Sequence, residues 1–101
     1  MRTTLMLLDT LTERREEILQ IAENHGAFNV RIFGSVARGE ETAESDIDFL
    51  VDYDLKKTTP WFPGGLLMDW QELLGRKVDV LTENGISPLI RERVLSEARS
   101  L

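Results

Sequence analysis

The sequence predicts a small α/β (α+β) protein in which helices pack on a short sheet. Apolar residues recur at helical spacing in three segments of the chain. Short runs rich in β-branched and aromatic residues stand between those segments, which is typical of strands alternating with helices. The chain has 101 residues, a length that supports one hydrophobic core, so we expect one domain over residues 1–101.

The first predicted element is a helix over about residues 10–25. Thr10 and Glu13 have the spacing of a capping box, and apolar residues then recur on one helical face until Gly26. An earlier start near Thr4 is the alternative, because helix boundaries are the least certain part of such a prediction.

Two strands and a short turn are predicted next. Residues 28–33 alternate apolar with polar side chains and form the first strand, which ends at Gly34. Residues 35–39 can make one helical turn, and residues 40–45 form a polar loop. Residues 47–51 are apolar except for one aspartate and form the second strand.

The C-terminal part of the chain is predicted to contain two helices and a third strand. An apolar helical stripe over 66–74 ends at Gly75, a residue favoured just past a helix end, and a strand follows over 76–82. Ser87 and Pro88 have the pattern of an N-cap and a first helical position. The last helix is expected to bury Leu89, Ile90, Val94 and Ala98.

Charge and composition limit the possible functions. The formal net charge is −6, which argues against a protein that binds nucleic acid through its backbone phosphates. Without cysteine there is no disulfide, zinc-thiolate or thiol chemistry. The longest apolar runs are far shorter than the roughly 18–20 residues that a membrane span needs. We therefore expect a cytoplasmic protein with no direct nucleic-acid or membrane partner.

Two aspartates in the second predicted strand suggest a metal site. Asp46 and Asp48 are separated by one residue, so their side chains project from one face about 6.5–7 Å apart along the backbone. Two ionised carboxylates so close repel each other, and a bound cation relieves the repulsion. Oxygen ligands favour a hard ion such as Mg²⁺. The alternative is that Asp46 caps a turn and Asp48 is a solvated strand residue.

The Gly34-Ser35 step strengthens the metal interpretation. Glycine at a strand end lets the backbone approach a ligand closely, and a serine that opens a helical turn offers a hydroxyl and free N–H groups to phosphate oxygens. Alone, this step is a simple strand-ending turn. Sequential strands are usually neighbours, however, so this turn is expected beside Asp46 and Asp48.

Together these residues resemble a known signature. Gly34-Ser35, ten intervening residues and Asp46-Ile47-Asp48 resemble the G-S-x₁₀-D-x-D motif of the DNA polymerase β-like nucleotidyltransferase superfamily, in its minimal nucleotidyltransferase (MNT) branch. The segments "RIFGSVARGE", "SDIDFLVD", "LLGRKVDVLT" and "SPLIRERVLSEA" follow in the expected order, so the resemblance covers nearly the whole chain. It implies a small polymerase β-like fold with a short mixed sheet.

The resemblance also implies a reaction and roles for individual residues. A nucleoside monophosphate passes from a triphosphate, here ATP, to an acceptor hydroxyl, with two Mg²⁺ ions as cofactors. Asp46 and Asp48 match the metal ligands, and Asp79 matches a third carboxylate that helps to deprotonate the acceptor. The Gly34-Ser35 turn would hold the outer phosphates. Arg38 either contacts the leaving pyrophosphate or is a solvated loop arginine.

Stand-alone members of this branch resemble MntA-type antitoxins of HEPN–MNT toxin–antitoxin pairs, which transfer AMP to a tyrosine of a HEPN ribonuclease toxin. The resemblance thus implies a HEPN-domain toxin as partner in a hetero-oligomer. The rival functions are a non-catalytic antitoxin that acts by binding alone and a small-molecule nucleotidyltransferase of the aminoglycoside type. Trp61, Phe62 and Met68 either belong to a partner surface or cover the core of this protein.

Overall fold

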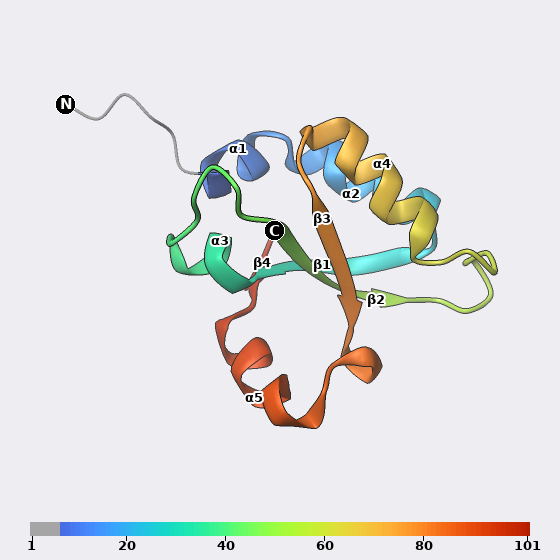
Figure 1. Ribbon diagram of the computed structural model, residues 1–101. Coiled ribbons are helices and arrows are strands. Elements are labelled where there is room, and N and C mark those ends of the chain that lie inside the picture. The colour runs from blue at the N-terminus through green and yellow to red at the C-terminus, as the bar shows by residue number, and fades with distance from the viewer. Residues whose placement is uncertain (1–6) are drawn as a thin grey trace.

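A computed structural model describes residues 7–101. Its sheet has four strands in the order β3-β2-β1-β4 (Figure 1). The antiparallel pair β1 (Ala27–Phe33) and β2 (Ile47–Tyr53) forms its centre, and β3 (Val78–Thr82) joins β2 in parallel. The two-residue strand β4 (Arg99–Ser100), which the sequence did not predict, adds antiparallel to β1. The sheet is therefore mixed, as expected.

Helices cover both faces of this sheet unequally. Helices α1 (Leu7–Glu13), α2 (Arg15–Asn24) and α4 (Gly64–Leu74) lie on one side, and α5 (Pro88–Glu97) lies on the other (Figure 1). The one-turn helix α3 (Gly34–Arg38) follows β1, and a 3₁₀ turn over Glu83–Gly85 follows β3. This arrangement confirms the α+β class.

The larger core lies under α1, α2 and α4. Trp70 of α4 is completely buried and stacks on Phe49 of β2 with ring centroids 4.1 Å apart. Its indole N–H donates to the carbonyl of Ile18 at 3.1 Å, which satisfies the one polar atom of the side chain. This core therefore fixes one face of β2 against two helices.

A smaller cluster lies between the sheet and α5. Phe33, Leu50, Ile86 and Val94 are buried in it. Alternate residues of β2 point to opposite faces, so Phe49 enters the large core while Leu50 enters the small one. Asp48 lies on the same face as Leu50, which puts the predicted site beside the small cluster.

The boundaries predicted for the N-terminal helix were wrong. Residues 7–24 form two helices that are separated at Arg14, and Thr10 lies inside the first of them, where its hydroxyl cannot act as an N-cap. The N–H of Leu7, the first helical residue, donates to a carboxylate oxygen of Glu41 at 2.9 Å. This cap comes from a loop distant in sequence, so no local pattern indicates it. Thr4, the alternative start, lies outside the described residues.

The second and third strands also differ from prediction at their ends. Strand β2 extends to Tyr53 because the guanidinium of Arg31 binds Asp52 at 2.8 Å, so that this aspartate lies in the sheet rather than ending it. Strand β3 begins at Val78 and not at residue 76, because Arg76 turns back to bind loop carbonyls. The end of α4 at Gly75, which has φ 64°, is as predicted.

The last helix begins as predicted but buries other residues. The Ser87 side chain accepts the N–H of Leu89, and Pro88 is the first helical residue. Leu89 is 94% exposed and Ile90 39% exposed, so their predicted burial was wrong. The helix contacts the sheet through its second half, where Val94 is buried and Ala98 is partly buried.

Candidate active site

The structure brings Asp48 and Asp79 together across two strands. Asp48 of β2 and Asp79 of β3 are register partners in the parallel pair, so both carboxylates leave the sheet on one face. Asp46 directly precedes β2, two residues before Asp48. The three aspartates predicted as site residues therefore lie at one end of the β2–β3 pair.

The backbone of Gly34 lies directly against Asp48. Phe33, the last residue of β1, pairs with Asp48, and Gly34 follows with φ 75°. A Cβ atom built on Gly34 would overlap the Oδ2 oxygen of Asp48. Both the left-handed backbone and the missing space require glycine here. The expected contact between the Gly34-Ser35 turn and the aspartates is thus present.

The electrostatics of the site centre on Asp48. Burial of this carboxyl, followed by the nearby charges of Asp79 and Asp46, raises the pKa of Asp48 to about 6 from an ordinary 3.8. The charge of Arg38 acts in the opposite direction and that of Glu97 in the same direction as the aspartates. The site therefore holds more negative charge than it neutralises, which is the condition that favours a bound cation.

Arg38 lies at this site, but it contacts carboxylates. Its Nη1 donates to Glu97 at 3.0 Å and its Nε donates to Glu40 at 2.9 Å. Glu97 also accepts the N–H of Gly34 at 2.7 Å. Arg38 is thus not a free loop arginine, and Glu97 is a site residue that sequence reasoning missed. Gly34 and Glu97 are 63 residues apart, and nothing in the sequence around Glu97 indicates the contact.

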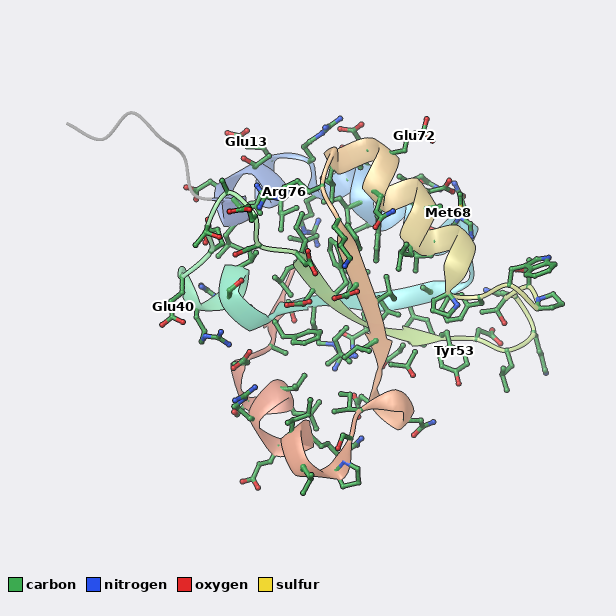
Figure 2. All side chains as sticks on the ribbon, viewed as in Figure 1. Glu13, Glu40, Tyr53, Met68, Glu72 and Arg76 are labelled. Atoms are coloured by element: carbon green, nitrogen blue, oxygen red, sulfur yellow. The ribbon has the colours of Figure 1, made fainter. Side chains whose placement is uncertain are left out.

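Two basic residues between α4 and β3 support the loop that leads into Asp46. The Nη2 of Arg76 donates to the carbonyl of Ser45 at 2.7 Å and to that of Thr42 at 3.1 Å. Arg76 lies against this loop in Figure 2. The Nζ of Lys77 lies 3.8 Å from an Oδ2 oxygen of Asp46. The loop before Asp46 is therefore held by Arg76 and Lys77, which connect α4 to β3.

The donor set fits Mg²⁺ in its chemistry. Asp46, Asp48 and Asp79 offer only oxygen ligands, and their mutual repulsion is what raises the pKa of Asp48 after burial. Over residues 7–101, however, no three acidic or histidine side chains converge closely enough to form a complete metal cage. Mg²⁺ usually takes one or two protein carboxylates and completes its shell with water and substrate phosphates. The arrangement fits that mode of binding.

Of the predicted partner residues, two are on the surface. Trp61 is 82% exposed and Met68, on the outer side of α4 in Figure 2, is 67% exposed. Phe62 is partly buried and packs against Tyr53 with centroids 5.2 Å apart, so it covers this protein's own core. In the part of the chain that the structure describes, no helix is long and apolar enough to cross a membrane.

Comparison with known proteins places the chain in a family. Residues 13–101 match the family described as "Nucleotidyltransferase domain". A relative from Methanocaldococcus jannaschii, named "Putative protein adenylyltransferase", is 41% identical over 88 residues, which cover 87% of this chain and 94% of the relative. The chain therefore belongs to the nucleotidyltransferase family, and it is a nucleotidyltransferase.

Solved structures agree with this assignment and indicate a branch within the family. One described as "Structure of putative minimal nucleotidyltransferase" has a TM-score of 0.80 and 45% identity, and the match covers 93% of this chain and 95% of the other. The minimal branch predicted from the sequence is thereby confirmed. Another, "Crystal structure of the toxin-antitoxin with AMP-PNP", has a TM-score of 0.65 and 20% identity over 84% of this chain and 69% of that one, a likeness of fold alone.

Proposed function

We propose that this protein transfers AMP from ATP, with Mg²⁺, to a tyrosine hydroxyl of a HEPN-type toxin and thereby acts as its antitoxin. The observation that carries the transferase chemistry is the register pair of Asp48 and Asp79 with the Gly34 backbone against Asp48. The relative named as a protein adenylyltransferase supports AMP as the group and protein as the acceptor. The toxin–antitoxin structure with AMP-PNP supports ATP and a toxin partner.

The reaction forms one bond and breaks one. The acceptor oxygen bonds to the α-phosphorus of ATP, the bond from that phosphorus to the bridging oxygen breaks, and pyrophosphate leaves. Asp46, Asp48 and Asp79 would hold Mg²⁺, which neutralises charge on the phosphates and lowers the pKa of the acceptor hydroxyl. Asp79, on the edge strand β3, would take the hydroxyl proton.

Binding of the phosphates is assigned to the turn after β1. The side-chain donors of this turn are the Ser35 hydroxyl and the Arg38 guanidinium, and the Ser35 N–H stands beside them in the first turn of α3. They would fix the outer phosphates so that the α-phosphorus lies beside the aspartates. Such positioning lowers the entropic part of the barrier on the nucleotide side.

The test is transfer of label to a protein. The purified protein is incubated with α-labelled ATP, Mg²⁺ and a purified HEPN-domain protein, and label on each chain is followed. We expect label on the HEPN-domain protein, and a loss of about 10³-fold or more with Asp48→Asn, because one essential ligand and its charge are removed. Asp69→Asn, an equal change on the exposed surface of α4, is the control and should keep full activity.

Two outcomes would replace the proposal. A tight complex without label in any chain would make this a non-catalytic antitoxin. Label on an added aminoglycoside or similar polyhydroxylated molecule, with none on protein, would make it a small-molecule nucleotidyltransferase. Replacing tyrosines of the labelled partner one at a time with phenylalanine then identifies the acceptor.

A further inference from the structure

Glu97 connects the two ends of α3. It is the last residue of α5, and its side chain is 15% exposed. Its Oε2 accepts the N–H of Gly34, the first residue of α3, at 2.7 Å. Arg38, the last residue of α3, donates from Nη1 to Oε2 at 3.0 Å and to Oε1 at 3.2 Å. One carboxylate therefore holds both the start and the end of this turn.

A carboxylate at this position is electrostatically unfavourable for the aspartates beside it. The site already contains Asp46, Asp48 and Asp79, and the charge of Glu97 adds to their effect on Asp48. Packing of α5 against the turn could be achieved with an uncharged side chain. What a carboxylate adds is a charge-assisted acceptor for a guanidinium, with fixed geometry.

The contact also decides which donors of the turn face a ligand. Because the Gly34 N–H is already bound, the N–H and hydroxyl of Ser35 are left to meet a phosphate. Because Nη1 of Arg38 is held by Glu97 and Nε by Glu40, the guanidinium plane is fixed rather than free to rotate. A fixed plane loses less entropy when it binds an anion.

We propose that Glu97 is a positioning residue of the phosphate site: it holds Arg38 in the orientation that receives the triphosphate, and through the Gly34 N–H it fixes the turn that presents Ser35. This proposal rests on the function proposed above, since it assigns Glu97 to the same nucleotide site. Because Glu97 acts through Arg38 and the Gly34 turn, its effect is expected on nucleotide binding.

The test compares Glu97→Gln with Glu92→Gln, an equal loss of charge at an exposed position of the same helix. We expect Glu97→Gln to weaken binding of Mg-AMP-PNP, measured by calorimetry, by roughly tenfold, the size of one charge-assisted hydrogen bond. KM for ATP should rise by a similar factor while kcat changes less than twofold. Glu92→Gln should leave both unchanged.

A double-variant cycle separates positioning from a general structural role. If Glu97 acts through Arg38, Glu97→Gln should have at most a twofold further effect on Kd in an Arg38→Ala background. A structural role alone would cost the same factor in both backgrounds and would lower the thermal midpoint equally. In the free protein, the amide proton resonance of Gly34 should shift upfield in Glu97→Gln, because a neutral amide oxygen is a weaker acceptor than a carboxylate, and this shift reports the weakened bond without any nucleotide.

The outcomes distinguish failure of this inference from failure of the proposed function. Equal or tighter binding by Glu97→Gln, with the wild-type protein binding normally, would overturn the positioning role and leave the transferase intact. An unshifted Gly34 amide would overturn it as well. A wild-type protein that binds no Mg-AMP-PNP would overturn the proposed function and, with it, the role assigned to Glu97.

Discussion

Strand β2 contributes different side chains to the two faces of the sheet. On the face of α2 and α4, β2 contributes Ile47, Phe49 and Val51, all completely buried. On the face of α5 it contributes Asp48 and Asp52, with Leu50 as the one buried apolar side chain between them. Stability is concentrated on one face, and this leaves the other free to carry charge. The comparison predicts how variants on each face should differ.

The largest expected effect is in the large core. Trp70→Ala should lower the free energy of unfolding by about 3–5 kcal/mol, because it removes a fully buried ring and leaves a cavity against Phe49. Val94→Ala in the small cluster should cost about 1–2 kcal/mol, since it removes two methyl groups. Urea unfolding monitored by far-UV circular dichroism measures both. Equal losses would contradict the conclusion that stability is concentrated on the face of α2 and α4.

Next in size is the glycine at the boundary between the strand and the site. Gly34→Ala should cost about 2–3 kcal/mol, because its new Cβ meets Asp48 in addition to the strain of a positive φ. Gly75→Ala is the matched control: φ is 64° there, but no atom lies within 4 Å of the added Cβ. It should cost only about 1 kcal/mol. Thermal unfolding of both variants checks the difference, which vanishes if the contact with Asp48 is easily relieved.

A smaller effect, of opposite sign, is expected at Asp48. Its pKa is raised to about 6 from 3.8, so the folded state binds this proton more tightly than the unfolded state does. The associated stability is full below pH 4 and is lost as the pH rises through 6. Asp48→Asn should therefore stabilise the metal-free protein at pH 7 by about 1 kcal/mol, a value reduced for partial exposure.

The pH dependence of that effect provides its control. The stabilising difference between Asp48→Asn and the wild-type protein should disappear near pH 4, where the wild-type carboxyl is also neutral. Glu72→Gln, at an exposed position of α4, is the control and should change the free energy of unfolding by less than about 0.5 kcal/mol at either pH. A destabilised Asp48→Asn at pH 7 would mean that the carboxylate makes favourable contacts that outweigh its burial.

The smallest effect is expected on the outer side of α5. Leu89 is 94% exposed, so Leu89→Ala should change the free energy of unfolding by less than about 0.5 kcal/mol. The same urea measurement applies. A loss comparable to that of Val94→Ala would mean that the first turn of α5 packs against the rest of the chain in solution.

Local patterns predicted much of this fold because their causes are local. Gly75 and the Ser87-Pro88 pair mark helix ends through backbone conformation and capping, which involve only near neighbours. The alternation in β2 was sufficient to place Asp48 on the face opposite Ile47, Phe49 and Val51. In each case the signal and the structure lie within a few residues of each other.

What the sequence could not predict involves partners distant along the chain. The start of α1 depends on Glu41, 34 residues away, and the orientation of Arg38 depends on Glu97, 59 residues away. Leu89 and Ile90 look like core residues until the position of α5 over the sheet is known. Asp79 was assigned through resemblance, because only the parallel register brings it opposite Asp48.

The parallel register also makes the connection after α4 unusually sensitive to its length. Only residues 75–77 separate α4 from β3, and the Lys77 carbonyl already accepts the N–H of Ile47 at 3.0 Å. One inserted residue that shifted β3 along β2 by a single position would turn Asp79 towards the tryptophan side of the sheet and bring a valine to face Asp48. The length of this short connection is therefore a requirement of the chemistry as well as of the fold.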